Sequence, residues 1–134
     1  MIPAFDENGV LPPGIHPAAL DEIELRFGSA TEIRQAQFES IRWLMAELRM
    51  ISGIQRVVLN GSFVTDVPEP NDVDCAVLVS DNFDWDSAIV ESLAEGLPFL
   101  VPLFSDDDDF EFLVESLFAS DRSAVSKGMI EVVP

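Results

Sequence analysis

The clearest regular pattern in the chain is a stripe of apolar residues, spaced three and four positions apart, between Thr31 and Ser52. This spacing predicts an amphipathic helix, because such positions fall on one side of an α-helix. Ser29 or Thr31 is placed to cap its start, and Gly53 stands where a helix often ends. The apolar positions are Ile33, Phe38, Ile41, Met45 and Leu48, with Leu44 and Ile51 widening the stripe.

Beyond Gly53 the pattern changes to short apolar runs rich in β-branched residues, which predict strands. The expected strands are Ile54–Leu59, Asp72–Val79, Pro98–Phe104 and Met129–Val133. Helices are expected from Trp85 or Ser87 to Ala94 and from Asp109 to Ala119, and Gly61–Asn71 is expected to be a loop or short helical turn. This mixed order predicts an α+β fold, an α/β sandwich in which helices cover a small mixed β-sheet.

The first 28 residues predict an irregular arm followed by a short helix. Turn signals at Asp6–Gly9 and Pro12–Gly14 leave little room for regular structure before the helix. Pro17 is expected in the first turn of that helix, and Gly28 at its end. The chain therefore divides into an N-terminal arm with a short helix, residues 1–28, and residues 29–134, which together make one compact domain.

Composition adds a strong negative charge to this picture. The 134 residues include 25 acidic and 7 basic side chains, a formal net charge of −18, while 48% of the residues are hydrophobic. Such a surface repels nucleic acid, so general DNA binding is not expected, whereas a basic protein partner or divalent cations suit it. Neither a signal peptide nor a membrane segment is expected, and the single cysteine, Cys75, excludes an internal disulfide. We expect a cytoplasmic protein.

The residues that could carry chemistry lie in and beside the loop between the expected strands Ile54–Leu59 and Asp72–Val79. Two carboxylates at alternate positions of a strand, Asp72 and Asp74, project from the same face and repel each other. Mg²⁺ removes this repulsion, because it prefers carboxylate oxygens and binds substrate phosphates at the same time. Gly61 allows the backbone to approach a ligand closely, and Ser62 adds a hydroxyl donor. These parts position and neutralise a phosphate chain, as phosphoryl or nucleotidyl transfer requires.

The segment resembles the DNA polymerase beta-like nucleotidyltransferase superfamily, which pairs a Gly-Ser or Gly-Gly step with a later Asp-apolar-Asp. This chain has Gly61, Ser62, Asp72, Val73 and Asp74 at the expected spacing. Within that superfamily it is similar to the small bacterial and archaeal minimal nucleotidyltransferases, some of which act as antitoxins. The resemblance implies that Asp72 and Asp74 bind Mg²⁺ and act in catalysis, and that Gly61 and Ser62 hold the NTP triphosphate. It also implies a nucleotidyltransferase-like domain at residues 29–134.

The chain departs from that family pattern in two ways. A third carboxylate is expected on the strand Pro98–Phe104, which contains no acid; Asp106, Glu131 or no residue at all are the alternatives. Cations for a triphosphate are also scarce: Arg34, Arg42 and Arg49 are expected to be solvated or paired with Glu39 or Glu47 on the long helix. Arg122 and Lys127, in a polar loop before the last strand, are the candidates to approach the site.

Two functions follow from the sequence. The first is a nucleotidyltransferase-like protein that binds Mg-NTP and transfers a nucleoside monophosphate to a protein or RNA acceptor. The second is a catalytically degenerate fold that acts as an acidic, antitoxin-like partner of a protein such as a cognate toxin. A domain unrelated to nucleotides requires Pro70-Asn71-Asp72 to be an ordinary turn and Asp74 to lie on a solvated strand face. Three further residues are expected in the core: Cys75, Trp43 and Trp85, the last with an interface as its alternative.

Overall fold

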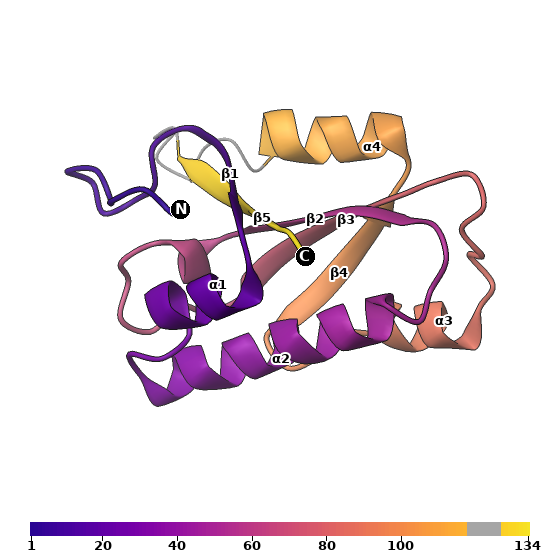
Figure 1. The fold of residues 1–134 in the computed structure, drawn as a ribbon, viewed down its shortest axis with the longest axis horizontal. Coiled ribbons are helices and arrows are strands. Elements are labelled where there is room, and N and C mark those ends of the chain that lie inside the picture. The colour runs from indigo at the N-terminus through magenta and orange to yellow at the C-terminus, as the bar shows by residue number, and fades with distance from the viewer. Residues whose placement is uncertain (118–126) are drawn as a thin grey trace.

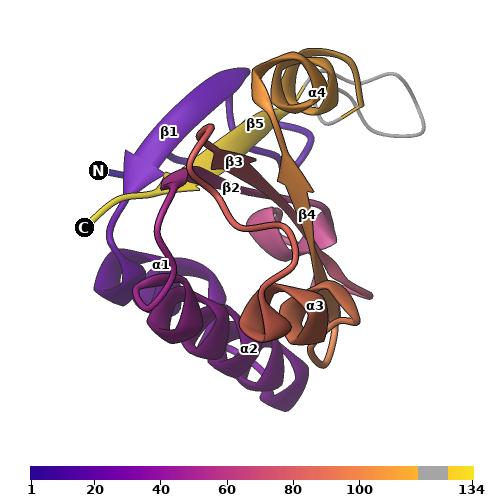
Figure 2. The ribbon, with the colours of Figure 1, turned by 90° about the vertical axis from the view of Figure 1, so that its right-hand side faces the viewer.

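A computed structural model describes residues 1–117 and 127–134 as one mixed sheet with helices on both faces (Figure 1). Helices α1, α2 and α3 cover one face of the sheet, and α4 covers the other (Figures 1 and 2). This confirms the α+β sandwich. The strands are β1 Gly14–Ala18, β2 Ile54–Asn60, β3 Val73–Val79, β4 Leu100–Ser105 and β5 Gly128–Val132; the helices are α1 Leu20–Phe27, α2 Glu32–Leu48, α3 Ala88–Ala94 and α4 Asp107–Phe112.

The sheet has the strand order β1-β5-β2-β3-β4. Strands β2 and β3 form an antiparallel pair in which Asn60 lies opposite Asp74, and β4 runs parallel to β3 with Val101 beside Asp74. Strand β5 is inserted between β1 and β2, parallel to the first and antiparallel to the second. This order places the loop between β2 and β3 at one end of the sheet, next to the start of β4.

Two apolar layers result from the alternation of side chains along the strands. On β3, Cys75 and Val77 belong to the main core under α1, α2 and α3, as expected for Cys75. Ala76 and Leu78 belong to a smaller core under α4, together with Phe110 and Met129. Asp74 shares the alternation of Ala76, and therefore lies on the α4 side of the sheet, beyond the cover of that helix.

Helix α2 forms where the apolar stripe predicts it. Thr31 is the cap, and its side-chain oxygen accepts a hydrogen bond from the Arg34 N–H at 3.2 Å. The helix ends at Leu48, four residues before the expected end. Gly53 instead adopts a φ of +89° at the approach to β2, where a Cβ would lie 2.9 Å from the Phe83 backbone.

The first strand corrects the sequence prediction for the N-terminal segment. Pro17 lies in β1, not in the first turn of a helix, and α1 begins only at Leu20. Local sequence patterns do not predict this strand, because its partner, β5, lies more than a hundred residues further along the chain. A proline is tolerated here because β1 is an edge strand. Residues 1–28 share the main core with the rest of the chain through Ile2, Leu11, Ala18, Ile23 and Phe27.

The remaining differences are local. Helix α4 begins at Asp107 and continues as a π-helical turn, Leu113–Leu117; the last two residues of the predicted helix lie outside the described residues. Trp43 is 63% exposed and is not a core anchor, and Trp85 is exposed as well. None of the described helices combines the length and the apolar character needed to cross a membrane.

Candidate functional site

Gly61 and Asp74 meet where β2 ends and β3 begins. Gly61 has a φ of +87°, which favours glycine, and a Cβ there would lie 3.0 Å from Asp74 Oδ2 and 3.3 Å from Asp74 N. The absent side chain therefore lets the Asp74 carboxylate lie directly against the Gly61 backbone. Asn60, which precedes the glycine, is buried and lies opposite Asp74 in the antiparallel pair.

Asp72 lies one residue before β3, on the approach to Asp74. Both carboxylates border one hollow of about 350 Å³, whose other wall is formed by the start of β4. Partial burial raises the pKa of Asp74; Lys127 opposes this increase, and Asp72 adds to it. The structure thus brings Asp72, Asp74 and Gly61 together, with the Lys127 cation within electrostatic reach, while Arg122 lies outside the described residues.

Ser62 begins a 3-10 turn, Ser62–Val64, that follows Gly61 directly. Its Oγ accepts a hydrogen bond from the Asn71 N–H at 3.2 Å, which holds the two ends of the connecting loop together. The hydroxyl also carries one hydrogen that it can donate. Ser62 therefore lies beside both Gly61 and the residue that precedes Asp72, in the position the sequence suggested.

One side of helix α2 holds this loop in place, through three residues spaced three apart. Thr31 Oγ1 donates to Pro68 O at 3.2 Å, and Gln37 Nε2 donates to Pro70 O at 2.7 Å. Between them, the buried Arg34 guanidinium donates to four backbone carbonyls, those of Phe27, Phe63, Thr65 and Val67, at 2.5–3.0 Å.

Arg34 is therefore not solvated or paired with a glutamate, as its helical position suggested. Burial lowers the pKa of Arg34, and the nearby Asp66 carboxylate opposes that change. The expectation holds for Arg42, which pairs with Glu39 at 2.9 Å and also with Glu24. Arg49 is exposed. The position of Arg34 in the helix did not indicate that its side chain turns inward, because three of the carbonyls it binds belong to the distant segment between β2 and β3.

Neither alternative for a third carboxylate faces the pair. Asp106 follows Ser105, which is in register with Leu78, roughly 13 Å along β3 from Asp74. Its side chain caps α4 by accepting from the Asp109 N–H. Glu131 accepts two hydrogen bonds from Arg56, at 2.5 and 3.1 Å, and raises the pKa of that arginine.

The donor set nonetheless suits one magnesium ion. Within residues 1–117 and 127–134, no three His, Cys, Asp or Glu side chains are grouped to hold a metal ion. Mg²⁺ does not need such a group, because it is commonly held by one or two carboxylates with the remaining positions taken by water and substrate phosphates. Asp72 and Asp74 supply hard oxygen donors and border the same hollow, and the Gly61 backbone lies against Asp74.

Comparison with known proteins places the chain in a family by sequence. The model of a family of unknown function, DUF6932, matches residues 3–133. The chain belongs to this family. Neither the curated proteins nor the solved structures contain a significant match to it.

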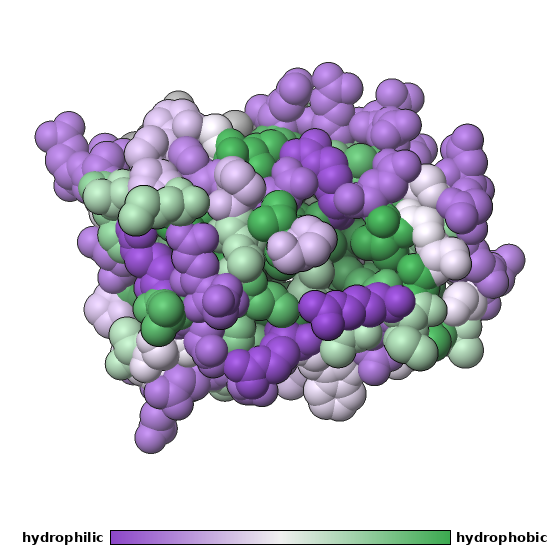
Figure 3. All heavy atoms as spheres, viewed as in Figure 1, coloured by the Kyte–Doolittle hydropathy of each residue, from purple (hydrophilic) through white to green (hydrophobic). Residues whose placement is uncertain are grey.

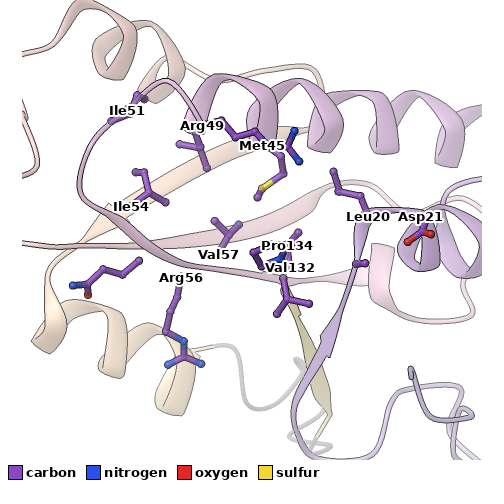
Figure 4. A pocket seen from close by; sticks show the side chains of 14 residues that line it. Leu20, Asp21, Met45, Arg49, Ile51, Ile54, Arg56, Val57, Val132 and Pro134 are labelled. Carbon is purple, nitrogen blue, oxygen red and sulfur yellow. The ribbon is translucent and has the colours of Figure 1, made fainter.

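A second hollow of the DUF6932 chain, about 470 Å³, lies on the opposite face of the sheet, between α1, the end of α2 and β2 (Figure 4). Its wall is mostly apolar, with Met45, Ile54 and Val57 among its residues, and hydrophobic surface is visible there between α2 and the sheet (Figure 3). It is larger and more apolar than the hollow beside Asp74, but no carboxylate pair borders it. We therefore assign the candidate chemistry to the smaller hollow.

In the absence of magnesium, Asp74→Asn is expected to raise the free energy of unfolding at pH 7. The folded-state pKa of Asp74 is raised, so ionised Asp74 is less favourable in the folded chain than in the unfolded one. This penalty is present above the folded pKa and disappears below the ordinary value of 3.8, where both states are protonated. Urea unfolding of both variants across this range measures the difference, with Asp81→Asn, at the far end of β3, as the control. A loss of stability at neutral pH contradicts this account.

Proposed function

We propose that the protein binds a nucleoside triphosphate together with Mg²⁺ at Gly61, Ser62, Asp72 and Asp74. The observation that carries this proposal is that the Asp74 carboxylate lies directly against the Gly61 backbone and borders the same hollow as Asp72. Two adjacent anions, one with a raised pKa, favour a cation, and a glycine with positive φ followed by a serine favours a phosphate beside it. The resemblance to the nucleotidyltransferase superfamily supports the same assignment.

The reaction that such a site supports is transfer of a nucleoside monophosphate to a protein or RNA acceptor. Bound Mg²⁺ would supply charge neutralisation and orientation of the phosphates. Asp72 and Asp74 would hold the Mg²⁺ ion. Gly61 would let the triphosphate approach the backbone, and the Ser62 hydroxyl would donate a hydrogen bond to that triphosphate. Among the described residues, Lys127 is the cation whose charge lowers the pKa of Asp74. Among the described residues, no carboxylate besides Asp72 and Asp74 borders the hollow to accept the proton of the acceptor hydroxyl, so binding of Mg-NTP is the primary proposal and transfer the secondary one.

Calorimetric titration of the purified chain with ATP, in the presence and absence of Mg²⁺, tests the binding. We expect binding that requires Mg²⁺, and labelled nucleotide transferred to an added protein or RNA would extend the proposal to catalysis. If ATP fails to bind at any magnesium concentration, the proposal is wrong.

A specific surface favours a second function, the binding of a basic protein partner such as a cognate toxin. Val101 and Leu103 on β4 and Phe112 on α4 are exposed around a hollow of about 550 Å³, which Glu91 and Asp109 also border. Exposed apolar side chains bordered by acids suit a partner with an apolar centre and a basic rim, as does the net charge of −18.

The edge of β4 is poorly suited to receive another strand. The N–H and C=O of Leu100 already pair with Leu97, and Pro102 has no N–H to donate. A partner would therefore contact the side chains of this surface.

For this second function we expect Leu103→Asp to abolish co-purification of a basic partner protein with this chain. Leu103 is 42% exposed on the apolar surface, so a charge there disrupts contacts without entering the core. Leu25→Asp, at an 81% exposed position on α1, is the matched control and is expected to retain the partner. Equal retention by both variants would count against this surface.

A further inference from the structure

The hollow beside the two carboxylates has two chemically different walls. Asp72 and Asp74 form one wall, and the side chains of β4 and of the turn before it form the other. The second wall is apolar and open to solvent, since Phe99 is 36% and Val101 50% exposed. A volume of about 350 Å³ is at the lower end of the range for small-molecule pockets, roughly 300–1,000 Å³. A ligand that fills it must therefore combine an anionic part, bound through a cation, with an apolar part.

Phe99 is fixed beside these acids by its backbone. Its carbonyl accepts a hydrogen bond from the Val73 N–H at 2.8 Å, and Val73 lies between the two aspartates. Its φ of +66° makes it the one non-glycine residue with positive φ in the described part of the chain. That conformation is costly for a phenylalanine, and glycine would be the favoured residue. The ring packs against no other aromatic ring or cation within residues 1–117 and 127–134.

We propose that Phe99 is the platform on which the base of the bound nucleotide stacks, an inference that rests on the proposed binding of Mg-NTP. A nucleotide has the two parts that this hollow requires, an anionic phosphate chain and a flat aromatic base. Stacking on an exposed aromatic ring is a general way in which proteins hold bases. The tie between Phe99 O and Val73 N keeps this platform at a constant position relative to Asp72 and Asp74.

The same wall determines how selective the site is. Apart from the two carboxylates, the side chains bordering the hollow are apolar or, in Cys75, a buried thiol. Such a wall has no amide or hydroxyl side chain to read the hydrogen-bonding edge of a base, whereas stacking accepts any base. We therefore expect ATP and GTP to bind with similar affinity.

The test compares Mg-ATP with Mg-bound inorganic triphosphate, which has the phosphates but no base, on the wild-type chain and on Phe99→Gly. Glycine suits a φ of +66°, so this variant removes the ring without straining the turn. We expect Phe99→Gly to bind Mg-ATP about tenfold more weakly or worse, a size typical of losing one base–aromatic stack. Binding of inorganic triphosphate should not change, and Phe99→Tyr, which retains a ring, should bind both ligands as the wild type does.

Trp43→Ala, which removes an exposed aromatic side chain from α2, is the matched control and should change neither affinity. Wild-type protein that binds ATP no more tightly than inorganic triphosphate would overturn the stacking proposal while leaving the proposed function intact. Phe99→Gly with unchanged ATP affinity, or with an equal loss for both ligands, would overturn it too. If the wild type binds neither ligand, the proposed function and this inference both fail.

Discussion

Replacing Asp74 by asparagine is expected to weaken magnesium-dependent binding of ATP by at least about 100-fold. Residues that only orient a metal ligand typically cost about 10- to 100-fold when changed, and Asp74 is proposed to hold the ion directly. Asparagine preserves the shape of the side chain and removes the negative charge. Asp72→Asn is expected to act in the same direction, and titration calorimetry with Mg-ATP measures both.

The controls separate loss of the site from loss of the fold. Asp74→Asn is expected to be at least as stable as the wild type at pH 7, because it removes a carboxylate whose pKa is raised mainly by burial. A loss of binding in this variant is therefore not explained by unfolding. Asp81→Asn removes the same charge at the other end of β3 and should bind Mg-ATP normally. If Asp72→Asn and Asp74→Asn both bind Mg-ATP like the wild type, the assigned site is wrong.

Replacing Arg34 by methionine is expected to lower the free energy of unfolding by about 3 kcal/mol or more. The guanidinium donates to the carbonyls of four residues, and hydrogen bonds to a charged group contribute about 1.5–3 kcal/mol each, though not additively. Methionine fills much of the same volume but has no donor, so buried carbonyls lose their partner. Urea unfolding measures the loss, which is a large part of the roughly 5–15 kcal/mol of a typical domain.

Two variants show whether the donor geometry is the cause. Arg34→Lys keeps the charge but lacks the planar fork of five donors, so it should restore little of the lost stability. Arg42→Ala removes an exposed arginine from the same helix, with ion pairs to Glu24 and Glu39, and should cost less than about 1 kcal/mol. Equal losses for Arg34→Met and Arg42→Ala would contradict a special role for Arg34.

The elements that the sequence predicted well are those whose signal is local. The stripe on α2 and the β-branched runs of β2 and β3 repeat with the period of the structure they form, so neighbouring residues determine them. The same holds for Gly61 and Asp74, because the two strands beside them are consecutive in the chain and pair with each other in antiparallel fashion. The sequence could therefore predict their proximity without the rest of the fold.

Strand β1 and the role of Arg34 were missed for the opposite reason. β1 is a strand because β5 pairs with it, and Arg34 is buried because carbonyls from the end of α1 and from the segment between β2 and β3 converge on it. Phe99 is a third case, since nothing in a phenylalanine after a proline indicates positive φ. Each of these depends on contacts between segments far apart in the chain, which local periodicity does not record.

By itself, then, the sequence determined the α+β class, the acidic surface and the pairing of a glycine–serine step with two aspartates. These follow from composition and from spacings of about a dozen residues. The tertiary structure alone decided that Phe99, in the turn before β4, borders the same hollow as Asp72 and Asp74. It also decided that Asp106 and Glu131 have other partners and do not face these two acids. Finally, it decided that the charge of Lys127 acts on Asp74. The physical reason is strand order and register: β4 lies beside β3, and β5 beside β2, through hydrogen bonds between residues that the chain keeps far apart.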